Sequence, residues 1–184
     1  MRKNERILVT GGAGFVGGHL VDALLAEGYR VRVLDNLAPP THSRELPEWF
    51  NKQAEFQRGD VRNKKDWSRA LRGVDFVFHL AAYMDFHPDF STYIDTNIKS
   101  VSLLYEVILE KKLSIKKIIL ASSQSVYGEG TYRCEKHGTV YPSPRTEEQL
   151  KRKEWEISCP IDGSSLTPVA QKESDPLTPT IPYG

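Results

Sequence analysis

Residues 9–17 read VTGGAGFVG, and this stretch decides the fold. Its glycines at Gly11, Gly14 and Gly17 stand between a short β-branched run, residues 6–10, and a helical pattern. A glycine-rich turn of this kind lets the backbone approach a pyrophosphate, whose charge then lies at the helix N-terminus. Because such turns also occur for packing alone, the motif needs support from the rest of the chain.

Short β-branched runs alternate with helical patterns along the first two thirds of the chain. This alternation predicts βαβ units around a parallel sheet. The apolar residues of 74–80 are nearly consecutive, as in a strand covered on both faces. The helix after the glycine turn should end at Gly28, and Asn63 should cap a helix that ends at Gly73. The segments of this alternating strand and helix pattern are residues 6–10, 16–28, 30–35, 74–82, 88–112 and 116–123.

Composition narrows the classes of function. The 184 residues carry 25 Lys and Arg against 24 Asp and Glu. This near-zero net charge does not favour binding to nucleic acid or to an anionic membrane, so we expect a small-molecule ligand. The N-terminal stretch is too short for a signal-peptide core and no long apolar run follows, so we expect a cytoplasmic protein. In a reducing compartment, metal binding or burial explains Cys134 and Cys159 better than a disulfide does.

Asp35 closes the strand that follows the first helix, 18 residues beyond Gly17. A carboxylate there can accept hydrogen bonds from both hydroxyls of an adenosine ribose and would repel a 2′-phosphate. The alternative is a turn residue before Asn36. Together with the glycine turn, Asp35 favours NAD over NADP.

Five motifs in register resemble the extended short-chain dehydrogenases, specifically the nucleotide-sugar epimerases: TGGAGFVG, LDNL, GDVRN, HLAA and SSQSVYG. The resemblance covers Arg6 to Gly128, resumes at Pro179 to Gly184, and implies an α/β fold with a Rossmann-type doubly wound parallel sheet, truncated after about its fifth strand. It implies that Phe15 and Val16 lie along the pyrophosphate. The cofactor-binding residues expected in all are Gly11, Gly14, Phe15, Val16, Gly17, Asp35, Asn36, Asp60, Val61, Leu80, Ala81, Ala82 and Asn97.

Several of these residues also suit purely structural roles. By the resemblance, Asp60 and Val61 would hold the adenine, and Leu80 would contact the cofactor. Ala81 and Ala82 are small residues that equally fit the end of a buried strand. Asn97 could serve only to tie down its helix.

The resemblance also indicates the reaction. Ser123 would hydrogen-bond a sugar oxygen both as alcohol and as ketone, whereas Ser122 is expected to be packed. Related dehydratases carry an Asp-Glu pair, where this chain has Gln124 and Ser125. Eliminating water needs a general acid and a general base. Epimerisation of a nucleotide-linked sugar at C4, through a 4-keto intermediate, does not need this pair, because a tyrosine base and the nicotinamide suffice.

Tyr183 matches the first position of the family's Tyr-x-x-x-Lys motif, within the closing residues TIPYG. As catalytic base it would rely on a lysine four residues later, past Gly184. A free phenol titrates near pH 10, so acting as a base near pH 7 takes about 4 kcal/mol of help. We therefore expect little or no activity from residues 1–184 alone. The alternatives are a terminal loop tyrosine and a non-catalytic NAD-binding module whose insertion docks a protein partner.

Residues 129–174, called the insertion here, are polar and proline-rich, and we expect no further sheet in them. CEKHG at 134–138 and CPIDG at 159–163 each have the ligand-x-x-ligand-Gly form of a zinc knuckle. They predict zinc held by Cys134, His137, Cys159 and Asp162. The alternative is an exposed histidine with buried cysteines. A similar insertion in some deoxysugar epimerases favours a deoxysugar substrate.

The predicted organisation is a Rossmann region at 1–128, the insertion at 129–174 and a return segment at 175–184. Within the insertion, Thr146 and Gln149 form a capping box for a short helix reaching about Trp155. Family dimers pair two helices. One corresponds to residues 100–112 and the other begins at Tyr183, so a homodimer is an open alternative that this chain does not favour.

Overall fold

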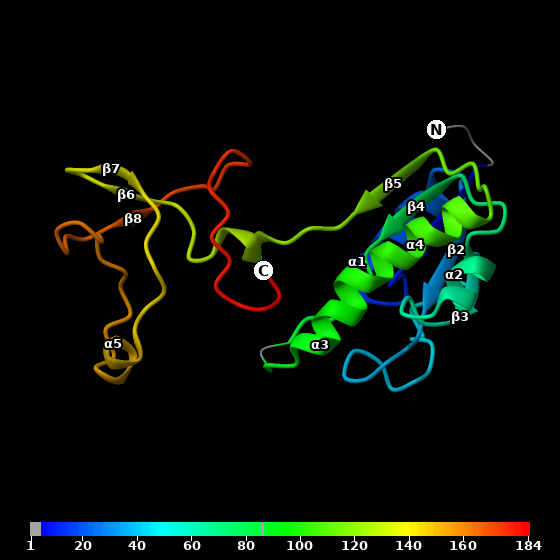
Figure 1. The fold of residues 1–184 in the computed structure, drawn as a ribbon, viewed down its shortest axis with the longest axis horizontal. Helices are drawn as coiled ribbons and strands as arrows, with labels where there is room; N and C mark the ends of the chain where they lie inside the picture. Colours follow the sequence, from blue (N-terminus) through cyan, green and yellow to red (C-terminus); the bar gives the residue numbers. More distant parts are fainter. Residues whose placement is uncertain (1–4, 86) are drawn as a thin grey trace. The chain divides into compact units, whose positions relative to one another are not determined.

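The computed structural model describes residues 5–85 and 87–184. The chain divides into two compact units, the first ending at Ala121 and the second comprising Ser122–Gly184. Figure 1 shows the elements of both units. The expected division into 1–128, 129–174 and 175–184 stays a prediction.

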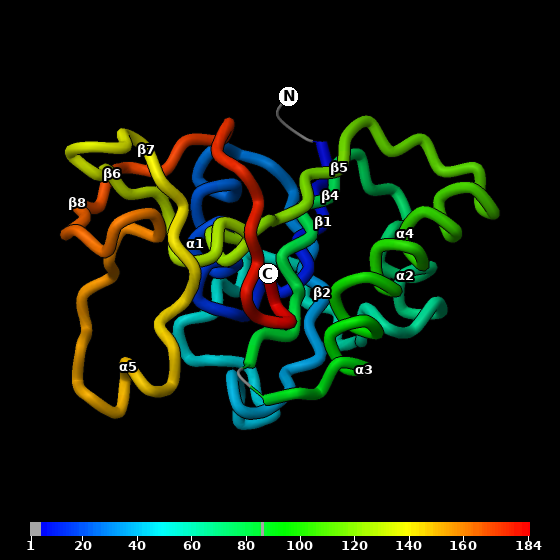
Figure 2. Tube along the Cα trace, turned by 60° about the vertical axis from the view of Figure 1, so that its left-hand side comes forward, coloured from blue at the N-terminus to red at the C-terminus, as the bar shows by residue number. Residues whose placement is uncertain are grey.

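The first unit is built on a five-stranded parallel sheet in the order β3-β2-β1-β4-β5. The chain starts at the centre of the sheet, with β1 between β2 and β4, and then builds outward on both sides (Figure 2). This is the predicted doubly wound α/β fold, and it is confirmed. The strands are β1 (Arg6–Thr10), β2 (Arg30–Asp35), β3 (Glu55–Arg58), β4 (Phe76–His79) and β5 (Lys117–Leu120).

Helices pack on both faces of this sheet. Successive side chains of β1 point to opposite faces, so they belong to two different apolar clusters. Ile7 and Val9 pack in one apolar cluster with Val21 of α1. Leu8 packs in a second cluster with Trp67 of α2 and with α4. The helices are α1 (Phe15–Ala26), α2 (Lys64–Ala70), α3 (Phe90–Tyr93), the π-helix η1 (Ile94–Ile98) and α4 (Lys99–Glu110).

Local signals set most of the helix ends as predicted. Helix α2 is an exception, because it ends at Ala70 with Leu71 as its C-cap, before the end expected at Gly73. Gly28 and Gly73 have positive φ angles of 84° and 65°, the left-handed conformation that glycine adopts without a Cβ penalty. The Asn63 side chain accepts a hydrogen bond from the backbone N–H of Lys65 at the start of α2. The strand expected at 74–80 is shorter, and spans Phe76–His79.

The second unit contains a small antiparallel sheet in the order β7-β6-β8. The expectation of no further sheet in the insertion was therefore wrong. The CEKHG turn folds the chain back so that Tyr132 pairs with Val140, and these strands are too short to give a periodic sequence pattern. The elements are the 3-10 helix η2 (Gln124–Tyr127), β6 (Tyr132–Cys134), β7 (Gly138–Val140), α5 (Glu147–Lys151) and β8 (Thr167–Pro168).

Helix α5 begins as predicted and ends early. Thr146 caps it by accepting a hydrogen bond from the backbone N–H of Gln149 at 3.2 Å. The capping box is only half formed, because the Gln149 side chain donates to the Glu156 carbonyl instead. Lys153 takes a φ of 61°, a left-handed conformation that stops the helix well before Trp155. In the part of the chain that the structure describes, no helix is long and apolar enough to cross a membrane.

Candidate functional site

The glycine turn between β1 and α1 requires glycine at two positions for different reasons. Gly11 has a φ of 70°, and a Cβ there would lie 2.9 Å from the backbone nitrogen of Ala81. A Cβ on Gly17 would lie 2.1 Å from the carbonyl oxygen of Gly11. The turn therefore brings β1, β4 and the start of α1 closer together than any side chain would allow.

The N-terminus of α1 has no side-chain cap, since its N-cap residue is Gly14. The first N–H groups of a helix have no acceptor within the helix and point outward with the positive end of its dipole. The side chains of Phe15 and Val16 are 78% and 65% exposed. The contact of these two residues with a pyrophosphate stays a prediction.

A cavity of about 430 Å³ lies beside this turn in the first unit, and we call it the cofactor cleft. Nine of the thirteen predicted cofactor residues line it: Gly11, Gly14, Asp35, Asn36, Asp60, Val61, Leu80, Ala81 and Ala82. Phe15, Val16, Gly17 and Asn97 do not line it. Sequence reasoning missed several lining residues, among them Arg62, Tyr83, Met84, Thr92 and Thr96.

Asp35 is buried at the end of β2, with 8% of the residue exposed. Its Oδ2 accepts a hydrogen bond from the backbone N–H of Ala13 at 3.1 Å, and its Oδ1 accepts one from Leu37 at 2.9 Å. Each carboxylate oxygen can accept more than one hydrogen bond, so both keep capacity for a ligand. Asp35 thus fixes the glycine turn and presents a negative charge to the cleft.

Asp60 is held in its ionised form. Burial alone would raise its pKa, but hydrogen bonds from the side chain and backbone of Arg62, and from Asn36, lower the pKa of Asp60 to about 2. The Arg62 guanidinium donates to both carboxylate oxygens, at 3.0 and 2.7 Å. This ion pair at the cleft wall gives Asp60 and Asn36 fixed orientations.

Asn97, in the π-helix η1, clamps the chain that follows β4. Its Oδ1 accepts a hydrogen bond from the backbone N–H of Tyr83 at 2.8 Å, and its Nδ2 donates to the Tyr83 carbonyl at 2.9 Å. Asn97 therefore has the structural role of tying the chain to its helix. Its contact with a cofactor stays a prediction.

The sequence did not predict a buried polar network behind the cleft. His79 of β4 lies between Thr10 of β1 and Ser100 of α4, with Nδ1···Oγ1 and Nε2···Oγ distances of 2.6 and 3.0 Å. Burial lowers the pKa of His79 to about 4. A histidine inside an otherwise apolar strand was the available signal, since such a residue needs polar partners in the core.

The predicted catalytic residues both belong to the second unit. Ser123 is the N-cap of η2, and its Oγ accepts a hydrogen bond from the backbone N–H of Ser125 at 3.1 Å. The segment that contains Tyr183 runs beside η2, because Thr178 N–H donates to the Val126 carbonyl at 2.8 Å. A Cβ on Gly184 would lie 2.6 Å from the Ser125 carbonyl oxygen. The half-buried Tyr183 therefore belongs to a segment packed against the turn that begins with Ser123.

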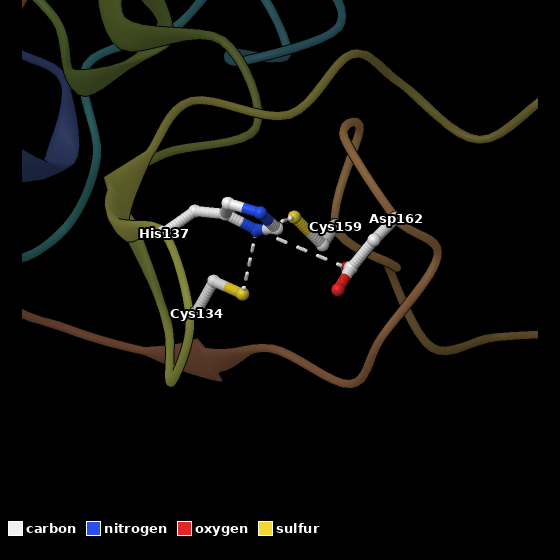
Figure 3. A group of neighbouring side chains, drawn as sticks. All are labelled: Cys134, His137, Cys159 and Asp162. Atoms are coloured by element: carbon white, nitrogen blue, oxygen red, sulfur yellow. Dashed lines mark hydrogen bonds and ion pairs between the residues drawn. The ribbon is translucent and has the colours of Figure 1, made fainter.

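The four predicted metal ligands come together in the second unit (Figure 3). Their ligand atoms all lie within 4.8 Å of one another. Figure 3 shows the His137 ring, from the β6–β7 turn, pointing toward Cys159 and Asp162 of the other turn. Hydrogen bonds from the Ser164 hydroxyl above all, and from the Lys136 and His137 backbone, outweigh burial and lower the pKa of Cys134 to about 6.

Comparison with known proteins gives matches along most of the chain. A family model described as "NAD dependent epimerase/dehydratase family" matches residues 7–148. A dTDP-L-rhamnose 4-epimerase of Burkholderia thailandensis is 31% identical over 186 residues, which is 98% of this chain and 50% of that protein. A putative UDP-glucose 4-epimerase of Methanocaldococcus jannaschii is 36% identical over 129 residues, 68% of this chain and 41% of that protein.

Among solved structures, the UDP-glucuronic acid 4-epimerase of Bacillus cereus in complex with NAD superposes with a TM-score of 0.66 and 30% identity. The match covers 97% of this chain and 47% of the solved chain. The chain thus spans about half the length of the relatives it matches.

Proposed function

The chain belongs to the NAD dependent epimerase/dehydratase family, and on that premise we propose that it takes part in the NAD-dependent epimerisation of a nucleotide-linked sugar at C4. The supporting relatives are 4-epimerases by name. One observation carries the proposal: the glycine turn, which has no room for a Cβ at Gly11 or Gly17, opens on the same cleft as Asp35.

The residues of the first unit suit NAD. The uncapped start of α1 offers N–H groups to the pyrophosphate, and the Asp35 carboxylate offers acceptors to the adenosine ribose. Asp60, Asn36 and Val61 would border the adenine. A 2′-phosphate would meet the negative charge of Asp35, which favours NAD over NADP. When bound, NAD supplies the hydride acceptor and donor that epimerisation requires.

The proposed chemistry of the second unit rests on two hydroxyls. Tyr183, as phenolate, would take the proton of the C4 hydroxyl as that carbon is oxidised, and would return it after the sugar has presented its other face. Ser123 would donate a hydrogen bond to the same oxygen, which a hydroxyl can do whether its partner is an alcohol or a ketone. Its Oγ already accepts from Ser125, which leaves its proton for the sugar.

Elimination of water is the competing reaction within the family. It needs an acid and a base near the sugar, and the residues that follow Ser123 are Gln124 and Ser125, neither of which is acidic. Epimerisation does not need this acidic pair, because the C4 hydroxyl proton and the C4 hydride are removed and then returned.

A deoxysugar is the favoured substrate class. The alignment with the dTDP-L-rhamnose 4-epimerase covers 98% of this chain and so includes the insertion, whereas the putative UDP-glucose 4-epimerase aligns over 68%. The sequence alignment that reaches the insertion is thus with an enzyme named for a 6-deoxyhexose, while the structural match to the UDP-glucuronic acid 4-epimerase also covers 97% of this chain.

The proposal is tested by incubating the intact protein with NAD and either a dTDP-linked 6-deoxyhexose or a UDP-hexose. Proton NMR of the anomeric region distinguishes the two C4 epimers. Formation of the C4 epimer, faster with the deoxyhexose, supports the proposal. A dehydrated 4-keto sugar as the final product would overturn it.

A further inference from the structure

We propose that the second unit binds one zinc ion through Cys134 Sγ, His137 Nδ1, Cys159 Sγ and an Asp162 carboxylate oxygen. The site would join two turns that lie far apart in the sequence. The inference is independent of the proposed enzymatic activity, since none of these residues is assigned to the cofactor or to the sugar.

The distances between the ligand atoms suit a tetrahedral ion. Zinc bonds of about 2.3 Å to sulfur and 2.05 Å to nitrogen imply a sulfur-to-nitrogen separation of about 3.5 Å. His137 Nδ1 lies 3.4 Å from Cys134 Sγ and 3.5 Å from Cys159 Sγ. The nearest Asp162 oxygen, Oδ1, lies 3.9 Å from Nδ1, against about 3.4 Å for an ideal tetrahedron. Binding through Oδ1 therefore needs a small movement of the carboxylate and the release of one of its two hydrogen bonds from Ser164.

A single hydrogen bond from His137 does not account for the closeness of these groups. One ring nitrogen of His137 faces two sulfurs and a carboxylate oxygen at once. In any protonation state, Nδ1 offers either one proton or one lone pair, so it cannot satisfy three electron-rich partners. A cation at the centre satisfies all four groups together.

The two turns have matching backbone conformations. Gly138 and Gly163, which end CEKHG and CPIDG, have φ angles of 72° and 73°. A Cβ on either glycine would meet nothing within 4 Å, so glycine is needed there for its left-handed conformation and not for space. Each turn thus presents one ligand at its first position and one directly before its glycine, in the manner of a zinc knuckle.

Asp162 is held in place for the fourth position. Its Oδ1 accepts hydrogen bonds from the Ser164 hydroxyl at 2.6 Å and the Ser164 backbone N–H at 3.0 Å. Its Oδ2 accepts one from Lys136 at 3.1 Å. Such partners orient a metal ligand and are themselves needed for full affinity.

The surrounding core is small. The buried cluster of this region consists of Cys134, Val140 and Cys159, with Tyr132 and Leu166 packed against it. So few apolar residues rarely offset the entropy of ordering a segment of this length. Zinc binding would therefore contribute directly to folding of the insertion.

The test is the metal content of the full chain, purified without chelator and measured by mass spectrometry. About one zinc ion per chain is expected, with loss after Cys134→Ser or Cys159→Ser. Glu135→Gln is the matched control, because it removes an acidic group from the same turn without touching the four ligands. Less than about 0.2 zinc per chain in the wild type would overturn the proposal, as would full retention in both cysteine variants.

Two further variants keep the test decisive if the serine variants fail to fold. Asp162→Cys should bind zinc more tightly than the wild type, because a third thiolate suits this ion better than a carboxylate. Ser164→Ala should weaken binding by about 10–100-fold. Both affinities are measured by competition with a chromophoric chelator. Unchanged affinity in Asp162→Cys, or cobalt-substituted protein without a thiolate-to-metal charge-transfer band, would contradict the assigned ligand set.

Discussion

Thr10 Oγ1 lies 2.6 Å from His79 Nδ1, and the other contacts of the hydroxyl fix the direction of this hydrogen bond. Thr10 Oγ1 accepts from the backbone N–H groups of Leu80 at 3.2 Å and Ala81 at 3.1 Å. These use both of its lone pairs, so its proton goes to Nδ1. His79 is then neutral, with its proton on Nε2 directed at Ser100, 3.0 Å away.

The first prediction concerns stability against pH. The pKa of His79 is lowered to about 4 from an ordinary 6.5, so the unfolded chain binds the proton more readily. The contribution is fully present above pH 6.5 and is lost as the pH falls from 6.5 toward 4. The loss is about 3 kcal/mol at most. Urea unfolding followed by tryptophan fluorescence should show this decline.

His79→Gln should have a flatter pH dependence over the same range, whatever its stability at pH 7. His87→Gln is the control, because the His87 side chain is 76% exposed, and it should behave as the wild type. An unchanged pH dependence in His79→Gln would show that the histidine does not titrate in this way.

The second prediction concerns the choice of cofactor. Asp35→Asn should bind NAD less tightly and discriminate less against NADP, because the repulsion of a 2′-phosphate is gone. Losing a hydrogen bond to a charged group costs about 1.5–3 kcal/mol, or about 10–100-fold in NAD affinity. Calorimetric titration of both cofactors checks this, and equal affinities in the wild type would refute the role given to Asp35.

The third prediction compares two glycines of one turn. A Cβ on Gly17 would lie 2.1 Å from the Gly11 carbonyl oxygen, whereas a Cβ on Gly14 would lie 3.3 Å from the same atom. Gly17→Ala should therefore lower the free energy of unfolding by about 1–3 kcal/mol or more. Gly14→Ala should cost clearly less. Chemical denaturation distinguishes them, and equal losses would mean that the close approach of α1 to the turn is not limiting.

The fourth prediction follows from the proposed function. Tyr183→Phe in the intact protein should reduce epimerisation by about 10²–10⁴-fold, the usual contribution of a positioned acid or base. Tyr141→Phe removes the hydroxyl of a partly exposed tyrosine of the insertion and should leave the rate unchanged. Steady-state rates with the same nucleotide-sugar provide the comparison. A Tyr183→Phe variant with full activity would exclude Tyr183 as the base.

Prediction from the sequence was most accurate at positions where the backbone conformation or a helix end requires one particular type of residue. Gly28 and Asn63 each marked a helix end that the structure confirms, and the alternation of strands and helices predicted the doubly wound sheet. Prediction was less accurate where the outcome depends on partners distant in the chain. Nothing in the sequence near His79 indicates that its hydrogen-bond partner is Thr10, 69 residues away.

Very short elements also escaped prediction. Strands β6, β7 and β8 span three, three and two residues, too few to show a period of two. Their pairing depends on the turn between them and not on an apolar pattern. The early end of α5 likewise depends on the left-handed conformation of Lys153, a residue type that gives no such signal.

The contact between Thr178 and η2 brings together the two ends of the segment that lies between them, which we call the module. Thr178 N–H donates to Val126 and its hydroxyl donates to the Tyr127 carbonyl at 3.0 Å, while a Cβ on Gly128 would lie 2.3 Å from the Thr178 carbonyl oxygen. The entry and exit of the module are thus fastened to each other. The entropy of closing a loop grows only with the logarithm of its length, so a longer or shorter segment between these ends would change the closure entropy little and leave the contacts of η2 with the Thr178 segment in place.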